Sequence, residues 1–377
     1  MTNTAPLKVG IIGGSYGGLC AALGLRCVGC DVHVFERSPD FDRIGGGIVV
    51  QPDFADYLEA FGYTRPESAA VPTVRRRFLN RDGSIRYTTG DNVFYSAWDT
   101  LLRSLRSAFD ANRVHNGMRL RSVSQTPDAV LCAFENGEQQ SFDLVVAADG
   151  IGSTIRRQLL PDVSPVYGGY VGYRGLVPEA ELTEDQAALI GDSFVLFDFP
   201  HSHILNYLIP GESGSIVPGQ RRWNWVWYVS ETPDQLASIL TDRDGHRHRV
   251  SLGPGEMSDG WGASVKSRAA QLLPPLLART VEQTEHPFVQ AIFDLSVPRM
   301  VFDRIALLGD SACVVRPHTA SGTSKAAGDA IALAHAVRDA AGDMPVALRS
   351  WETERLAVAR QITSYGKMIA ARGGLGG

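Results

Sequence analysis

Residues 7–37 are LKVGIIGGSYGGLCAALGLRCVGCDVHVFER, and this stretch decides the fold of the 377-residue chain. The apolar run at 7–12 is typical of a short buried strand, and the glycine-rich turn at 13–18 leads into an apolar helix. A second strand follows at 31–37. A strand, a tight turn, a helix and a second strand in this order predict a βαβ unit, the first part of a doubly wound α/β sheet.

The glycine-rich turn has the spacing of a phosphate-binding loop. Gly13 makes the tight turn, and Gly18 lets the helix pack closely on the strand. Ser15 stands at the middle glycine position of the GxGxxG pattern, where its small side chain still allows close approach and can hydrogen-bond a phosphate. Glu36 closes the second strand and is placed to accept hydrogen bonds from a ribose. This context favours dinucleotide binding, with Arg37 as a further contact, over a glycine-rich turn with an incidental acid.

Two later segments repeat the pattern of a strand, a turn and a helix. Residues 141–160 are SFDLVVAADGIGSTIRRQLL, and residues 304–337 run from RIALLGDSACVV through the loop RPHTASG into a helix of small residues. Between 166 and 294, strand-like stretches are broken by glycine, proline and polar turns, which predicts an inserted, mostly antiparallel sheet. We therefore expect an α/β protein with a Rossmann-like dinucleotide-binding domain at 1–165 and 295–377, and a β-rich substrate domain at 166–294.

Composition excludes several classes of protein. The net charge of -5 and the pI near 6.0 give no electrostatic reason to expect nucleic acid or an anionic membrane. We find neither a secretion signal nor an apolar run of roughly 18 residues, so no membrane span is expected. Five scattered cysteines favour reduced thiols and a cytoplasmic location. Cys27 and Cys30 have CxxC spacing but no second pair, so packing is favoured over a metal or redox site. The glycine-rich end, 371–377, is expected to be frayed.

Three motifs in order resemble one family. They are the turn GGSYGG, the pair Asp149–Gly150 and the pair Gly309–Asp310. From about 7 to 360 the chain resembles the class A FAD-dependent aromatic hydroxylases related to p-hydroxybenzoate hydroxylase. The resemblance implies that Asp310 binds the ribityl chain of FAD, and that Asp149 lies near the pyrophosphate and the path of NAD(P)H. Taken alone, each aspartate is equally explained as a strand-end turn or a helix cap.

Two loops are similar to the branch of that family that hydroxylates dihydroxypyridines. Residues 45–62, with Gly47 and Val49, look like the loop beside the flavin and the helix after it. Residues 316–330 replace the commoner Gly-Gln-Gly loop. This second loop contains Arg316, Pro317, His318, Gly322, Thr323 and Lys325. The resemblance makes Gly47, Val49, Pro317, Gly322 and Thr323 candidate contacts of FAD.

The chain also departs from the family pattern. Many relatives have an arginine at the start of the helix that here is SAWDTLLRSL, where Trp98 stands in its place. The usual contact of that arginine with the flavin therefore has no counterpart here.

The resemblance implies a reaction in which NAD(P)H reduces FAD and dioxygen then gives a flavin C4a-hydroperoxide. Its distal oxygen is electrophilic, so the ring under attack must be electron-rich, and ionising a ring hydroxyl enriches it. The protein must orient the ring, exclude water and ease deprotonation of the substrate. We expect a small aromatic or heteroaromatic substrate, with a hydroxypyridine favoured and a phenol as the alternative. As an assembly we expect a homodimer.

Histidine suits the role of the base in such a reaction. His203 and Tyr207 are an even number of residues apart on one predicted strand, so both face the same side and are candidates for substrate contact. The alternative is a pair on the surface of the sheet. His318 follows Pro317 in the loop expected beside the flavin, and its alternative is a histidine bonded to backbone. His246 and His248 lie in a charged loop and are given no role.

Trp223, Trp225 and Trp227 alternate along one predicted strand, so their side chains share a face. A stripe of this kind is more often core or interface than a wall that stacks on a substrate ring.

Other functions fit the sequence less well. A flavin-dependent halogenase would carry Trp-x-Trp-x-Ile-Pro, and WNWVWY lacks the last two residues. A non-catalytic protein with this fold would have no reason to keep both aspartate motifs. A reductase with two dinucleotides would need a second GxGxxG unit, which we do not find.

Overall fold

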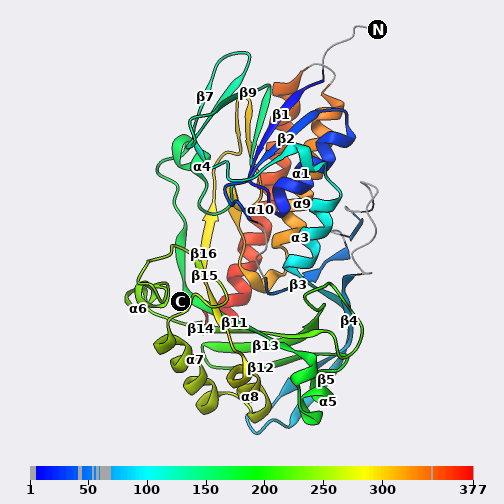
Figure 1. The fold of residues 1–377 in the computed structure, drawn as a ribbon, viewed down its shortest axis with the longest axis vertical. Helices are drawn as coiled ribbons and strands as arrows, with labels where there is room; N and C mark the ends of the chain where they lie inside the picture. Colours follow the sequence, from blue (N-terminus) through cyan, green and yellow to red (C-terminus); the bar gives the residue numbers. More distant parts are fainter. Residues whose placement is uncertain are drawn as a thin grey trace.

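The computed structural model describes residues 6–40, 45–52, 55–56, 59, 69–340 and 343–376. Its strands form two large sheets, one in the upper and one in the lower half of Figure 1, with helix α10 running between them. The fold is α/β, as the sequence predicts.

The first sheet has six strands and contains the predicted βαβ unit. Its neighbours are parallel except for the pair β17 and β18. In spatial order the strands are β17 (Val301–Phe302), β18 (Ile305–Leu307), β10 (Leu144–Ala147), β1 (Lys8–Ile12), β2 (Asp31–Phe35) and β6 (Val114–His115). Helices α1 (Tyr16–Cys27) and α9 (Gly322–Asp339) pack against each other beside this sheet. The three strand–turn–helix segments predicted from the sequence thus meet in one parallel sheet.

The second sheet is mostly antiparallel; only β12 and β4 run parallel. Its order is β15 (Ser251–Leu252), β16 (Phe288–Ser296), β11 (Val166–Pro178), β14 (Arg222–Ser230), β13 (Ser202–Ile209), β12 (Ser193–Phe199), β4 (Val71–Leu79), β5 (Ile85–Ala97) and β3 (Gly47–Val50), and β19 (Cys313–Val314) pairs with β16. Strands β3, β4 and β5 come from the first 165 residues. The domain boundaries at 165/166 and 294/295 remain a prediction.

The other elements connect or cover these sheets. A three-stranded sheet is made of β7 (Leu120–Gln125), β8 (Val130–Phe134) and β9 (Gln139–Phe142). The remaining helices are α3 (Trp98–Ser107), α4 (Thr154–Leu159), α5 (Glu184–Ile190), α6 (Pro233–Ile239), α7 (Asp259–Leu272), α8 (Pro275–Gln283) and α10 (Met344–Arg372), with short 3-10 turns η2 (Ala111–Arg113), η3 (Glu179–Glu181), η4 (Gly309–Ser311) and η5 (Pro317–Thr319).

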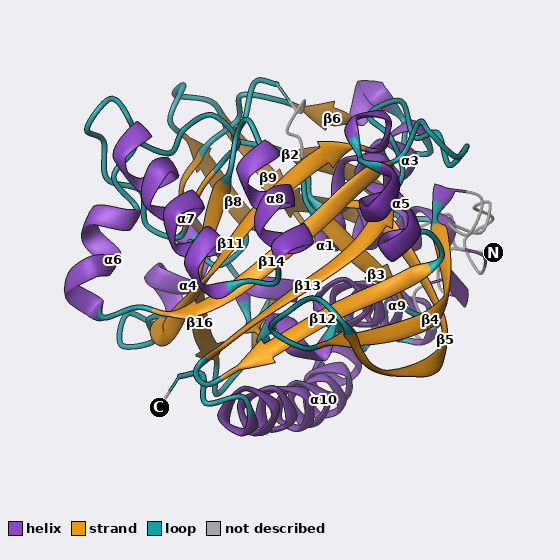
Figure 2. Cartoon of the chain, turned by 90° about the horizontal axis from the view of Figure 1, so that it is seen from below, coloured by secondary structure: helices purple, strands orange, loops and turns teal. Residues whose placement is uncertain are grey.

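One face of the large sheet, the one turned away from α10, packs into a hydrophobic core. Trp223, Trp225 and Trp227 are fully buried there and pack with apolar residues of α7 and α8, which lie across these strands in Figure 2. Each indole N–H donates to a polar side chain within the fold. The prediction that the tryptophan stripe is core is confirmed.

The inner face of the same sheet is turned toward α10. Residues alternate between faces along a strand. The cross-strand pairs His203 with Tyr228 and Tyr207 with Asn224 therefore share the face opposite the tryptophans. This face positions the candidate substrate residues.

The glycine-rich C-terminal segment is packed, and the expectation of a frayed end is wrong as far as Gly376. Leu375 is fully buried in a cluster with Tyr170 and Tyr228. His201 Nδ1 donates to the Gly374 carbonyl at 2.8 Å. The glycines allow this packing because a Cβ on Gly376 would overlap the Gly168 carbonyl oxygen.

Two further observations concern composition. All five cysteines are free thiols in the structure. Within the described ranges, no helix combines the length and the apolar character that a membrane span requires.

Candidate active site

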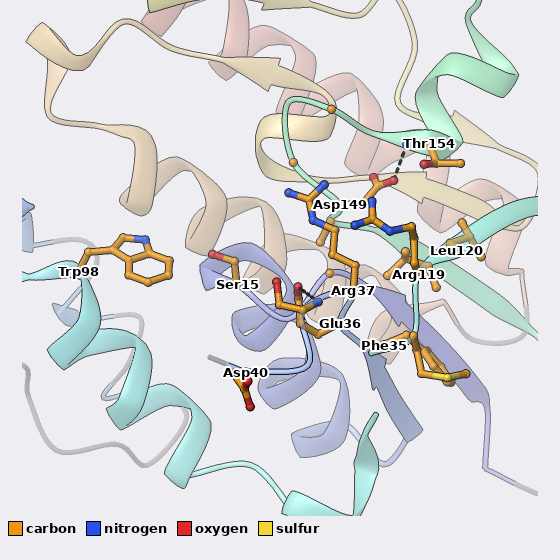
Figure 3. Close-up of a pocket in the computed structure, with 17 residues that line it drawn as sticks. Ser15, Phe35, Glu36, Arg37, Asp40, Trp98, Arg119, Leu120, Asp149 and Thr154 are labelled. Atoms are coloured by element: carbon orange, nitrogen blue, oxygen red, sulfur yellow. Dashed lines mark hydrogen bonds between the residues drawn. The ribbon is translucent and has the colours of Figure 1, made fainter. Parts of the chain in front are cut away.

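A pocket of about 240 Å³ lies where β1, β2 and β10 end (Figure 3). Its walls include Gly13, Ser15, Glu36, Arg37 and Asp149. The first glycine motif and the aspartate–glycine motif are far apart in sequence, and the parallel sheet places both on this one pocket.

The turn at the pocket needs glycine at two positions. Gly13 has φ of +108°, and a Cβ on it would overlap the carbonyl oxygen of Ala148, which follows β10. A Cβ on Gly18 would overlap the Gly13 carbonyl oxygen. The loop is therefore as tight as the sequence predicts, and it brings the start of α1 against the pocket.

Glu36 is held in place by backbone donors. Its Oε2 accepts from Gly14 N at 2.8 Å, and its Oε1 accepts from Ser38 N at 2.9 Å. Each carboxylate oxygen keeps a further acceptor site for a ligand hydroxyl. Ser15 is the N-cap residue of α1, and its hydroxyl makes no capping bond, so it also remains able to contact a ligand.

Asp149 combines a helix cap with an unfilled acceptor. Its Oδ2 accepts from Thr154 N at 2.7 Å at the start of α4, so the helix-cap explanation holds for this oxygen. Its Oδ1 is buried and has no hydrogen-bond partner within the described part of the chain. Burial raises the pKa of the carboxyl. A buried acceptor without a partner is costly unless a ligand donates to it, so the pocket fits a cofactor with hydroxyl groups.

Two basic side chains line the pocket near Asp149. In Figure 3 the guanidinium groups of Arg37 and Arg119 are directed to the same side of the pocket as the Asp149 carboxylate. Paired guanidinium groups suit a pyrophosphate. Sequence reasoning missed Arg119 because it belongs to no motif; only its position just before β7 brings it to the pocket.

Trp98 joins the pocket to the loop at 45–46. Its backbone N–H donates to the Gly46 carbonyl at 3.1 Å, and its own carbonyl accepts from the Tyr16 hydroxyl at 2.7 Å. A Cβ on Gly45 would lie 2.6 Å from the Trp98 Cβ. An aromatic ring thus occupies the start of α3 beside the pocket. The flavin loop predicted at 45–62 is described only at 45–52, 55–56 and 59.

Asp310 lies in η4, outside the lining of this pocket; its side chain is accessible to a ligand although many atoms of the fold surround it. Desolvation by the surrounding fold raises the pKa of its carboxyl, and the Lys325 ammonium opposes this shift. The preceding Gly309 is held on both sides, because its N–H donates to Asp329 Oδ2 at 3.2 Å and its carbonyl accepts from Lys325 Nζ at 3.2 Å. Arg355 completes this buried network through Asp329.

His318 and His203 form a second, aromatic site. Their ring centroids lie 5.1 Å apart, and Tyr228 lies 4.7 Å from His318. The Tyr170 hydroxyl hydrogen-bonds His318 Nε2 at 2.9 Å. Burial lowers the pKa of His203 to about 4. Burial, His203 and Arg316 lower the pKa of His318 to about 3, so both rings are neutral at neutral pH.

Tyr207 does not join the histidines. It shares their face of the sheet, but four residues along a strand span about 13 Å. Its ring lies 4.1 Å from that of Tyr95 and packs on Gly47, where a Cβ would overlap the tyrosine ring. The structure therefore brings His203 to His318, and Tyr207 to the predicted flavin loop. Val49 of β3 pairs with Tyr95 of β5.

The remaining predicted residues lie in and after the loop that carries His318. Pro317 begins η5, and Gly322 and Thr323 begin α9. Between them Ala320 has φ of +51°, a left-handed conformation that is costly for alanine and that the surrounding structure must hold in place.

Comparison with known proteins gives consistent matches. Residues 167–294 match a family model described as FAD binding domain-like. The chain is 33% identical to the 2,6-dihydroxypyridine 3-monooxygenase of Paenarthrobacter nicotinovorans, over 97% of this chain and 91% of that protein. It is 25% identical to the 6-hydroxynicotinate 3-monooxygenase of Pseudomonas fluorescens, over 88% and 83%. The solved structure of 2,6-dihydroxypyridine-3-hydroxylase from Arthrobacter nicotinovorans matches with a TM-score of 0.92 and 32% identity, over 99% and 94%.

The fold, the pocket and these matches define a flavoprotein monooxygenase, an enzyme that uses FAD and dioxygen to hydroxylate a small aromatic ring. Within that class, the chain belongs to the family of the 2,6-dihydroxypyridine 3-monooxygenase. The prediction of an FAD-dependent aromatic hydroxylase, made from three short motifs, is confirmed.

Proposed function

We propose that this enzyme hydroxylates a hydroxypyridine-like ring and takes its electrons from NAD(P)H. The observation that carries the proposal is the cluster of His203, His318, Tyr170 and Tyr228. These flat side chains offer neutral aromatic faces to a planar ring, with the cations of Arg316 and Arg174 nearby. Two relatives are named for reactions on hydroxylated pyridine rings, which supports the same substrate class here.

The proposed cofactor contacts follow the motifs. When bound, FAD supplies the activated oxygen, and the protein binds, orients and shields the reactants. Glu36 would hold the ribose of the adenosine half, and Asp149 and Ser15 would face the pyrophosphate. Asp310 would hold the ribityl chain. Further contacts are proposed for Gly13, Gly18, Arg37, Gly47, Val49, Pro317, Gly322 and Thr323.

The histidines are proposed to handle the proton of the ring hydroxyl. Both are neutral, so each offers an acceptor nitrogen. His318 can accept a proton at Nδ1 in the tautomer whose Nε2–H donates to the Tyr170 oxygen, and this is the tautomer that the proposal requires. Tyr207 would contact the ring from the side of the flavin loop.

The packed C-terminal segment is proposed to close this site from behind. Leu375 covers Tyr170 and Tyr228, and Gly373 lies beside the His203 ring. Excluding water here protects the activated oxygen from unproductive decay.

For assembly we propose a homodimer. The exposed apolar side chains of Tyr365 and Met368 on α10 support it. Sedimentation velocity measures the assembly directly.

The test of the proposed function uses purified holoenzyme. The oxidation of NADH and of NADPH is followed with a panel of hydroxypyridines and phenols. We expect one hydroxypyridine to accelerate oxidation and to give a product heavier by one oxygen atom. Acceleration by phenols alone would replace the substrate class, and acceleration by no ring compound would refute the proposal.

A further inference from the structure

We propose that Arg174 and Asn224 form a subsite for the ionised oxygen of the ring substrate. Neither residue belongs to a motif. The inference rests on the proposed function, because it concerns how the same site treats a hydroxylated ring.

The strand register places Arg174 between the two groups of candidate substrate residues. On β14, Asn224 lies opposite Tyr207, and Tyr228 lies opposite His203. Arg174 of β11 lies opposite Val226, midway between them on the same face. Arg174 therefore lies one strand away from Tyr228 and Asn224 and two strands away from His203 and Tyr207, and its long side chain brings the charge within range of Tyr207 and Tyr228.

No carboxylate pairs with the Arg174 guanidinium in the part of the chain that the structure describes. Its Nε is buried and has no hydrogen-bond partner among the described residues. Arg174 is half-buried, whereas the buried Arg222, Arg316 and Arg355 pair with Asp99, Asp294 and Asp329. The buried Arg156, whose Nε is also without a partner among the described residues, instead donates to two backbone carbonyls. An unpaired guanidinium held partly out of water is costly, and an anionic ligand removes that cost.

The field of Arg174 reaches both ends of this face. Burial raises the pKa of Tyr207 and of Tyr228, and the Arg174 charge opposes that shift for each hydroxyl. An oxygen of a bound ring between these two tyrosines would feel the same stabilisation of its ionised form.

Asn224 supplies a second donor with a fixed direction. Its Oδ1 accepts from Gly47 N at 2.7 Å, and because a backbone N–H can only donate, the amide oxygen must face that group. The Nδ2 atom consequently points elsewhere. It is buried and has no hydrogen-bond partner of good geometry in the described ranges, and as a donor near Tyr207 it lowers the pKa of that hydroxyl.

Both side chains lie beneath the predicted flavin loop. A Cβ on Gly46 would be 2.9 Å from Arg174 Nη1 and 3.4 Å from Asn224 Oδ1. The Arg174 guanidinium and the Asn224 side chain thus meet beneath the loop at 46–47, with the amide oxygen on the loop side and the Nδ2 group directed away from it.

The chemistry gives this subsite a purpose. A ring hydroxyl that ionises transfers its proton to a neutral imidazole or to water, and leaves a negative oxygen. His203 and His318 are weak bases in this environment, so the balance depends on stabilising the anion. Arginine remains protonated at every working pH and donates in a planar fork that suits an anionic oxygen.

The test compares Arg174→Met and Arg174→Gln with Arg174→Lys in flavin-loaded enzyme. The ultraviolet absorbance of a bound hydroxypyridine reports the pKa of its ring hydroxyl, and the flavin spectrum reports its Kd. We expect the neutral variants to raise that pKa by about one unit or more, which is roughly a tenfold loss of affinity for the ionised ring. Arg174→Lys should recover part of it.

The controls separate charge from general damage. Arg75→Met, on β4 of the same sheet and exposed, should behave as wild type. An O-methyl ether of the ring, which cannot ionise there, should bind wild type and Arg174→Met equally. A carboxylated pyridine without the hydroxyl distinguishes the other source of an anionic oxygen, and a loss of affinity confined to it would overturn the ring-oxygen assignment.

The possible failures are distinguishable. Wild type that binds and hydroxylates a ring, while the Met and Gln variants keep its pKa and Kd, would overturn the subsite alone. Wild type that binds no ring compound would overturn the proposed substrate class and this inference with it.

Discussion

The imidazole rings of His203 and His318 lie with their centroids 5.1 Å apart and their planes tilted by 54°, although one belongs to strand β13 and the other to the turn η5. The contact joins the ring-binding face of the large sheet to the loop that precedes α9. Because burial keeps both rings neutral, the pair forms an apolar end to the site, while the positive charge of Arg174 lies further along the sheet.

The neutral histidines predict how stability depends on pH. In the unfolded chain each histidine titrates near pH 6.5, whereas in the fold the pKa values are about 4 and about 3. Between these values the unfolded chain binds more protons, so the free energy of unfolding falls as pH drops from 6.5 toward 4. Replacing His203 by Leu should reduce the change in the free energy of unfolding between pH 7.5 and pH 4.5 by roughly 1–3 kcal/mol. Measuring Tm across this pH range shows the flatter dependence.

The exposed His246 provides the control for this measurement. His246→Gln should follow the wild-type curve. A His203→Leu curve parallel to wild type would show that His203 gains its proton in the fold as easily as in the unfolded chain.

Glu36→Ala should weaken FAD binding. The substitution removes the carboxylate that is anchored by Gly14 N and Ser38 N at the pocket. Loss of one or two charge-assisted hydrogen bonds corresponds to roughly 10- to 100-fold in Kd. Quenching of FAD fluorescence during reconstitution measures it, with the exposed Glu138→Gln as the matched control. Equal affinities for the two variants would remove Glu36 from the cofactor site.

Lys325→Met should destabilise the fold. Lys325 Nζ lies 2.8 Å from Asp329 Oδ2 and is buried, so the variant leaves part of a buried carboxylate without its partner. Arg355 still pairs with the other oxygen, which limits the loss to about 3 kcal/mol. Urea unfolding of both proteins measures it. Lys367→Met, at an exposed pair 3.7 Å from Asp294, should cost less than about 1 kcal/mol.

Leu375→Ala should uncouple NAD(P)H oxidation from hydroxylation and should leave the stability of the protein nearly unchanged. Leu375 is fully buried, but a chain segment after the last helix can detach without unfolding the core. Water then reaches Tyr170, Tyr228 and His203. We expect more hydrogen peroxide per NAD(P)H oxidised and a nearly unchanged Tm. The exposed Val346→Ala on α10 is the control. Wild-type coupling in Leu375→Ala would show that the segment does not shield the site.

Local patterns in the sequence determined the fold class and the cofactor. The GGSYGG turn predicts its own geometry because the backbone at Gly13 and Gly18 leaves no space for a Cβ, whatever surrounds it. The alternation of residues along a strand likewise placed His203 and Tyr207 on one face of their strand, and the three tryptophans on one face of theirs. These inferences hold because they depend on dihedral angles and on a period of two, which a short stretch of chain settles by itself.

Only the tertiary structure decided which of those residues meet. The contact of His203 with His318, the separation of Tyr207, the burial of Leu375 and the place of Arg119 at the pocket depend on strand register and on packing between elements remote in sequence. Arg174 is the clearest case. In the sequence it is an ordinary arginine of a strand. It becomes a candidate ligand of an anion because the fold holds its half-buried guanidinium beside Asn224 and the loop at 46–47, with no carboxylate paired to it among the described residues.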